Sequence, residues 1–152
     1  MKRLLTFLLC SLPLAVLGQT YEEEAVAAVL MGEAWSEGMR GMTAVADVIH
    51  QRAVEKGWTP LRVVAAHRGR VHAFSCVNGT SLDRLIEKFS PEPDFRAALQ
   101  LARLVCQAPD RLPCLVGPAN HYTRATERPY WARGRQPVAL IGQQAFYRLN
   151  HY

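Results

Sequence analysis

The fold is decided near the start of the chain by residues 20–35, which read TYEEEAVAAVLMGEAW. Thr20 and Glu23 have the spacing of a capping box, in which each side chain accepts a hydrogen bond from the backbone amide of the other. Acidic residues crowd the first turn, where the helix dipole favours negative charge, and an alanine-rich apolar run follows. The stretch therefore predicts a helix, interrupted near its end by Gly32.

Three more helices are expected downstream. Apolar residues recur at helical spacing over residues 38–56, and Gly57 follows as a stop. Thr59 and Pro60 are a cap and a first-turn proline, which predict a short helix to about Ala66. A further helix is predicted to start between residues 90 and 93 and to end before Pro109.

The remaining segments have the character of loops and strands. Residues 69–80 contain the Asn78-Gly79 turn signal and predict a loop, which is a frequent place for functional residues. The chain after Cys114 is aromatic and rich in turns, with a closing strand expected at residues 138–141 or 145–149. The expected fold class is mainly α (α+β), a helical domain with a small β or extended region toward the C-terminus.

The first residues have the pattern of a secretory signal. Lys2 and Arg3 precede an almost uncharged apolar run that ends near Leu17. This run is shorter than the roughly 20 residues that span a bilayer, so we expect no membrane span. We assign residues 1–18 to a signal peptide and residues 19–152 to a single domain, which is exported to the periplasm or secreted.

Composition excludes several functional classes. The chain has 18 basic and 13 acidic residues, so removing Lys2 and Arg3 leaves a net charge of about +3. No basic run is interleaved with aromatic residues, so we expect no nucleic acid partner. The histidines are scattered and no H-E-x-x-H motif occurs, so no metal site is predicted. We expect a monomer that needs no cofactor.

The cysteines leave one question open. After removal of the signal, Cys76, Cys106 and Cys114 remain. An exported protein permits a disulfide bond, and the short Cys106 to Cys114 segment could close as a small loop. Cys76 would then be a single thiol, either a small buried apolar residue or a nucleophile.

Glu33 is the strongest candidate for a catalytic group. It lies where the first helix is about to end, two positions before Trp35. Apolar surroundings and the negative end of a helix dipole both favour the protonated form of a carboxyl group, as a general acid requires. The alternative is an exposed glutamate without a catalytic role.

Several motifs resemble the cell wall hydrolase family that includes the spore cortex-lytic enzymes. Residues 32–38 read GEAWSEG and residues 44–52 read AVADVIHQR, like the opening of that family. Further matches are Phe74-Ser75-Cys76, His121-Tyr122, Ile141-Gly142 and Phe146-Tyr147, so the resemblance spans roughly residues 29–148.

The resemblance implies a lysozyme-like fold and cleavage of peptidoglycan between N-acetylmuramic acid and N-acetylglucosamine. The acid of the family's G-E-A motif falls on Glu33. Two positions depart from the pattern, because Gln144 replaces the closing-motif histidine and Gln51 replaces an asparagine. The change at Gln144 removes a histidine from the expected groove.

A glycosidase normally uses two carboxylates. Glu37 is a candidate for a second group in the groove, although it could instead be a cap or ion-pair partner at the start of the second helix. Lytic transglycosylases use one glutamate, first as acid and then as base toward the 6-hydroxyl of muramic acid. Because Glu33 is the one well-supported acid, we favour this single-glutamate route over a muramidase.

Other residues are candidates for binding the sugar. Flat aromatic side chains pack on the apolar faces of pyranose rings, and Ser or His side chains can bind acetamido or hydroxyl groups. The predicted substrate-binding residues are Glu37, Ser75, His121, Tyr122, Tyr130 and Trp131.

Two other classes of function compete with this interpretation. One is a cysteine-dependent amidase or peptidase of the cell wall, with Cys76 as nucleophile and His72 or His121 as base. The other is a peptidoglycan-binding module without catalytic activity.

Overall fold

The computed structural model describes residues 18–150. The predicted signal peptide lies outside this range except for Gly18. Within residues 18–150, no helix is long and apolar enough to cross a membrane. The fold class predicted from the sequence, mainly helical with small sheets, is confirmed.

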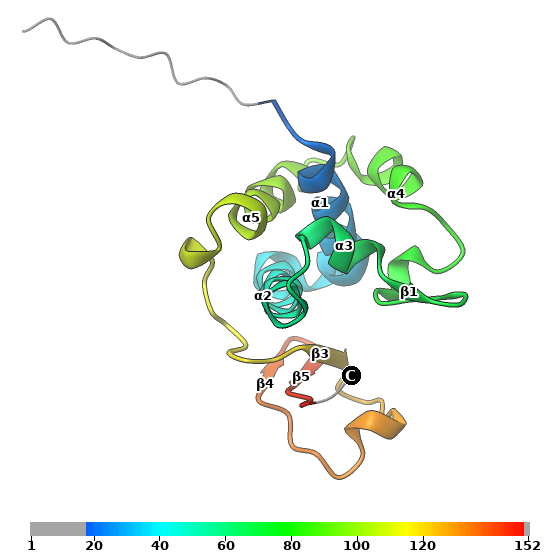
Figure 1. Cartoon of the computed structure of the whole chain (residues 1–152), viewed down its shortest axis with the longest axis vertical. Helices are drawn as coiled ribbons and strands as arrows, with labels where there is room; N and C mark the ends of the chain where they lie inside the picture. The colour runs from blue at the N-terminus through cyan, green and yellow to red at the C-terminus, as the bar shows by residue number, and fades with distance from the viewer. Residues whose placement is uncertain (1–17, 151–152) are drawn as a thin grey trace, which may run out of the picture.

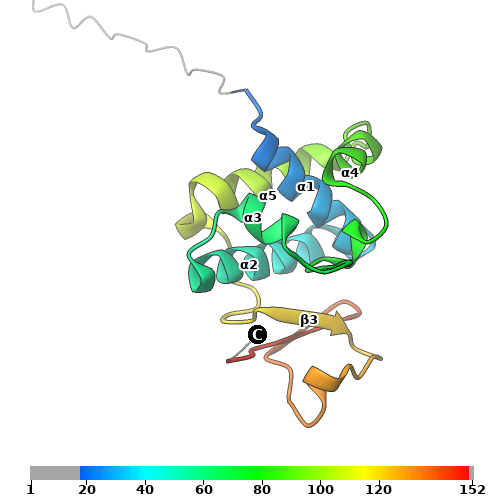
Figure 2. The ribbon, with the colours of Figure 1, turned by 45° about the vertical axis from the view of Figure 1, so that its right-hand side comes forward.

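Helices form one layer and a small sheet forms the other (Figures 1 and 2). The α-helices are α1 (Tyr21–Ala34), α2 (Gly38–Lys56), α3 (Pro60–Ala65), α4 (Leu82–Phe89) and α5 (Phe95–Gln107). Single 3₁₀ turns occur at η1 (Trp35–Glu37), η2 (Ser75–Val77), η3 (Pro109–Arg111) and η4 (Tyr130–Ala132).

Helix α1 is the centre of the helical layer. The seven residues from Ala25 to Met31 are all at most 2% exposed, because α1 packs against α2, α3, α4 and α5. The predicted capping box is present, with Glu23 N donating to Thr20 Oγ1 (3.2 Å) and Thr20 N donating to Glu23 Oε2 (3.3 Å). The buried Glu23 carboxylate also accepts hydrogen bonds from Arg103 and Gln107 of α5. A helix that is apolar on every side thus lies in the core.

The second layer is an antiparallel sheet in the order β3-β5-β4. Its strands are β3 (His121–Arg124), β4 (Ala139–Ile141) and β5 (Gln144–Tyr147). The two segments proposed as alternatives for a closing strand are both strands, β4 and β5, and they pair across a turn at Gly142. A separate hairpin of β1 (His67–Arg68) and β2 (Val71–His72) lies beside the helices.

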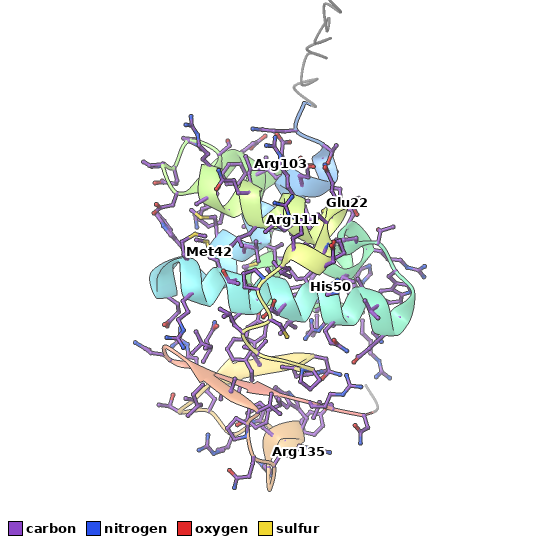
Figure 3. All side chains as sticks on the ribbon, turned by 90° about the vertical axis from the view of Figure 1, so that its left-hand side faces the viewer. Glu22, Met42, His50, Arg103, Arg111 and Arg135 are labelled. Atoms are coloured by element: carbon purple, nitrogen blue, oxygen red, sulfur yellow. The ribbon has the colours of Figure 1, made fainter. Side chains whose placement is uncertain are left out.

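Helix α2 lies on the side of the helical layer that faces the sheet, and it joins the two layers (Figure 3). Its Ala44 and Val48 form an apolar cluster with Phe146 of the sheet, among other residues. Asp47 accepts hydrogen bonds from the backbone N–H groups of Leu115 (2.6 Å) and Val116 (3.2 Å), just before the sheet begins. These contacts fix the distance between the helical layer and the sheet.

Several elements differ from the sequence expectations. Helix α4, strand β3 and the β1–β2 hairpin were not predicted, and α5 begins only at Phe95 because residues 90–94 form turns. Cys106 and Cys114 are not joined by a disulfide bond. Cys106 packs against the helical core, whereas Cys114 is exposed, so the loop between them does not close through sulfur.

Asp47 makes the stability of the fold depend on pH. Burial raises the pKa of Asp47 from 3.8 to about 6, although two N–H groups oppose this shift. Between pH 3.8 and pH 6 the folded state therefore binds more protons than the unfolded state. The stability that protonated Asp47 contributes is lost as pH rises through about 6. In Asp47→Asn, which keeps a carbonyl acceptor, we expect the free energy of unfolding relative to wild type to rise by about 2 kcal/mol between pH 4 and pH 7. Urea denaturation of both proteins at both pH values measures this difference in the free energy of unfolding. A difference that does not change with pH would contradict the raised pKa of Asp47.

Candidate active site

The carboxylate of Glu33, in the last turn of α1, accepts hydrogen bonds from two other parts of the fold. Tyr122 of β3 donates its hydroxyl to Oε2 (2.6 Å). The loop at η2 supplies two donors to Oε1, the backbone N–H of Cys76 (2.7 Å) and the hydroxyl of Ser75 (3.1 Å). Glu33 is half-buried, so one side of it faces the solvent.

The three donors differ in what they permit chemically. A backbone N–H can only donate, whereas the hydroxyls of Tyr122 and Ser75 can donate or accept. A proton on the carboxyl is therefore best accommodated on Oε2, where the Tyr122 hydroxyl can turn to accept. Burial and the negative charge of Glu33 raise the pKa of Tyr122 well above 10, so this hydroxyl keeps its own proton. The arrangement accommodates Glu33 in both its protonated and its ionised form.

Gly32 allows the η2 loop to reach Glu33. A Cβ atom at Gly32 would lie 2.7 Å from Cys76 Cβ and 2.9 Å from its sulfur, closer than such atoms approach in proteins. The absent side chain lets the loop pack directly against the end of α1, where Cys76 N–H meets the carboxylate. The Gly-Glu pair in the sequence thus has a structural reason.

The environment of Cys76 disfavours a thiolate. Burial is the largest cause that raises the pKa of the Cys76 thiol far above its ordinary value, and the charge of Glu33 adds to it. Its sulfur lies against the carbonyl of Val29 at 4.0 Å. A nucleophilic cysteine needs the opposite environment, with nearby positive charge.

A cleft of about 1060 Å³ passes Glu33. Its walls come from the helical layer, the β1–β2 hairpin, β3 and η4. Five of the predicted substrate-binding residues line it, namely Ser75, His121, Tyr122, Tyr130 and Trp131. These five candidates and Glu33 therefore meet on one cavity although they come from three separate parts of the chain.

The aromatic side chains of the cleft differ in exposure. Tyr130 is 83% exposed and offers an open ring at the rim. Trp131 is partly buried, with edge contacts from its ring to His121 (5.3 Å between centroids) and Tyr147 (5.5 Å). Burial and the charges of Arg52 and Lys56 lower the pKa of His121 to about 4, so its ring is neutral at pH 7.

Glu37 is not among the residues that line the cleft. Its Oε2 accepts a hydrogen bond from the backbone N–H of Gln143 (3.2 Å) in the turn between β4 and β5. The adjacent Gly142 has a φ of +54° and leaves no room for a side chain beside the Glu37 carboxylate. Glu37 thus attaches this turn to the junction of α1 and α2.

Gln144 of β5 supports the backbone at Glu33. Its Nε2 donates to the carbonyl oxygen of Glu33 (3.2 Å), and the side chain is 8% exposed. Its Oε1 is buried without a hydrogen-bond partner among the residues that the structure describes.

Sequence reasoning missed other lining residues, because they come from separate segments with no shared motif. The mild positive charge of the chain was the one available signal. The lining residues that were missed include Arg52, Lys56, Trp58, Arg68, Arg124 and Glu127. Within residues 18–150, no group of three or more His, Cys, Asp or Glu side chains is placed to hold a metal ion.

Comparison with known proteins identifies a family that the chain matches. The model of a family described as Cell Wall Hydrolase matches residues 36–147. No curated protein and no solved structure matches the chain. The matched range contains Ser75, Tyr122 and Gln144 but begins after Glu33, so the assignment of Glu33 depends on the geometry and on the Gly-Glu-Ala motif.

The close approach at Gly32 can be tested by adding one methyl group. Alanine is favoured over glycine inside a helix by about 1 kcal/mol, so without the contact Gly32→Ala would stabilise the protein. We expect the free energy of unfolding to fall instead, by about 1–3 kcal/mol, because the new Cβ overlaps Cys76. Chemical denaturation monitored by circular dichroism gives the sign, and a net stabilisation would contradict the close packing.

Proposed function

The chain belongs to the cell wall hydrolase family, and from this we propose that it cuts the glycan strands of peptidoglycan between N-acetylmuramic acid and N-acetylglucosamine, with Glu33 as general acid. The observation that carries the proposal is the Glu33 carboxylate on the wall of the cleft, held by Tyr122 and the η2 loop. Action on peptidoglycan is the property of the family, and the glycosidic bond as target is our inference.

The first step is transfer of a proton from Glu33 Oε2 to the glycosidic oxygen as the bond to the muramic acid C1 breaks. The carboxylate that remains is stabilised by Cys76 N–H and by the hydroxyls of Ser75 and Tyr122, which then all donate to it. These donors lower the cost of the charge that Glu33 acquires in the transition state.

In the second step the same carboxylate acts as a base. It removes the proton from the 6-hydroxyl of muramic acid, and that oxygen bonds to C1 to close a 1,6-anhydro ring. One glutamate returns to its starting state, which agrees with a site built around a single half-buried carboxylate. We therefore favour the lytic transglycosylase type.

A hydrolytic route needs a second carboxylate to activate water. Glu127 is exposed, lines the cleft and accepts a hydrogen bond from Thr123 Oγ1 (2.8 Å). For a muramidase mechanism, Glu127 is our candidate for the second carboxylate. Glu37 is not, because its carboxylate is bound to the β4–β5 turn.

Two other functions have less support. A cysteine amidase would need a reactive thiolate, which the burial of Cys76 and its acidic neighbour oppose. A binding module without activity would not need a carboxylate with three donors. We also propose that the protein acts as a monomer without cofactor in the periplasm or outside the cell, where the substrate lies.

Replacement of Glu33 by Gln tests the catalytic assignment. The amide cannot donate a carboxyl proton, so we expect cleavage of purified peptidoglycan to fall at least about 100-fold while folding and binding persist. Mass spectrometry of soluble products from residues 19–152 measures this. Anhydro ends made by the wild type indicate a transglycosylase, and reducing ends indicate a hydrolase. Wild-type activity in Glu33→Gln would refute the proposal.

Replacement of Cys76 by Ala tests the amidase alternative. Alanine keeps the backbone N–H that donates to Glu33 and removes only the sulfur. We expect glycan cleavage to persist, with a loss of stability of about 1 kcal/mol from the small cavity. The same product assay applies, and loss of activity in a folded Cys76→Ala, together with cut peptide stems in the wild type, would move the chemistry to the thiol.

A further inference from the structure

Exposed positive side chains reach the cleft from several elements. Lys56 ends α2, Arg68 belongs to the β1–β2 hairpin and Arg124 ends β3, and all three line the cleft. Arg52 also lines it, although it is buried and donates to the carbonyl of Asn120 (2.7 Å). The lining contains two carboxylates, Glu33 and Glu127. Cationic groups thus outnumber anionic groups around this cavity.

The register of the sheet places Arg124 on the same face as Tyr122 and Gln144. Arg124 pairs with Gln144 across the β3–β5 ladder, and Tyr122 lies two residues earlier on β3. Residues directly opposite each other, and residues two apart on a strand, point to the same face of a sheet. Tyr122 and Gln144 both touch Glu33. Arg124 therefore lies on the face of the sheet that meets the catalytic carboxylate.

Arg68 is held at the site by the hairpin that carries it. The hairpin is closed by the Arg68–Val71 pair and by a hydrogen bond from Ala73 N to Ala66 O (2.8 Å). A further bond, from His72 N to Asn78 Oδ1 (2.9 Å), connects it to the segment just after η2. The position of Arg68 is thus coupled to the loop that supplies two donors to Glu33.

These two arginines have no acidic partner in the described part of the chain. Among residues 18–150, no carboxylate lies within ion-pair distance of Arg68 or Arg124, and both side chains are exposed. After burial, the charges of Arg52 and Lys56 are the next causes that lower the pKa of His121, another residue of the cleft. A bound anion would reduce the repulsion among these cations.

We propose that Arg68 and Arg124 bind carboxylate groups carried by the muramic acid residues of the glycan strand, so that the enzyme prefers strands on which these groups are charged. The inference rests on the proposed function. Muramic acid bears a lactyl group, whose carboxyl is free on a denuded strand and amide-linked to a peptide stem otherwise. Stems carry carboxylates of their own, so both forms offer the same chemistry to a guanidinium group.

The test varies the charge of the protein and of the substrate together. The protein is wild type or Arg68→Gln/Arg124→Gln, and the substrate is sonicated peptidoglycan, either untreated or with its carboxylates converted to neutral methylamides. A matched control, Arg84→Gln/Arg96→Gln, removes two exposed arginines from α4 and α5 that do not line the cleft. The rate of soluble product formation at low substrate concentration gives kcat/KM for each combination.

We expect the cleft variant to lose about fivefold in kcat/KM on the charged substrate and clearly less on the neutral one, as two exposed ion pairs predict. The control variant should lose little on either substrate. An equal loss on both substrates, or an equal loss in the control, would overturn the proposal. On strands whose stems have been removed, the lactyl carboxyl is free. An excess loss there shows that the arginines also bind the lactyl carboxylate, and its absence restricts them to carboxylates of the stem; both outcomes support carboxylate binding.

Failure of this inference is separable from failure of the proposed function. Co-sedimentation of Glu33→Gln with both forms of peptidoglycan, with and without the two arginine changes, measures binding when cleavage is blocked. If Glu33→Gln still cleaves, the proposed function is wrong, whatever the arginines do. If it does not cleave and the arginine changes leave binding to the charged form unaltered, only the carboxylate inference is wrong.

Discussion

The site depends on one carboxylate that connects three parts of the fold. Glu33 belongs to the central helix, Cys76 N–H and Ser75 belong to the η2 loop, and Tyr122 belongs to the sheet. Each donor loses its partner if its element moves away, and for the less exposed donors, Cys76 N–H and Tyr122, an unpaired polar group costs about 1–3 kcal/mol. The same hydrogen bonds that hold the loop and the sheet to α1 therefore set the electrostatic environment of the proposed acid. The lack of a side chain at Gly32 is the steric condition for this arrangement.

Helix α2 provides the second constraint, because it sets the separation of the cleft walls. It uses buried polar groups as well as apolar packing. Asp47 holds the segment that leads into the sheet. Arg52 donates to the carbonyl of Asn120 (2.7 Å), just before β3, and to the carbonyl of Ala73 (3.4 Å), just after β2. Hydrogen bonds to charged groups have defined directions, whereas apolar contacts do not. Such bonds therefore specify the orientation of the sheet relative to the helices. Burial of Ala44 and Val48 alone would specify that orientation less closely.

Local rules predicted the long helices and the position of Glu33 but not the surroundings of Glu33. The capping box at Thr20 and the spacing over residues 38–56 depend on neighbours in the sequence, so they could be read directly. Strand β3 has four residues, and its pairing with β5 is fixed only by tertiary contacts, which is why Arg124 beside Gln144 could not be foreseen. The hydrogen bond of Glu37 could not be predicted from the sequence for the same reason, because its partner, Gln143, is more than 100 residues away in the chain. Ser75, Tyr122 and Trp131 were found because motif and residue chemistry named them before the fold placed them together.

The glutamine at position 144 shows what this position requires. The last carbonyls of a helix lack partners within the helix, and the carbonyl of Glu33 belongs to this group at the end of α1. This carbonyl needs a donor from the sheet, and Gln144 Nε2 donates to it at 3.2 Å. A histidine ring could also donate, but its charge would change with pH, whereas an amide donates at every pH. Relative to the histidine that the family resemblance implies at this position, glutamine therefore keeps the support of the backbone that carries the carboxylate. The cost is one buried acceptor, Oε1, without a partner in the part of the chain that the structure describes.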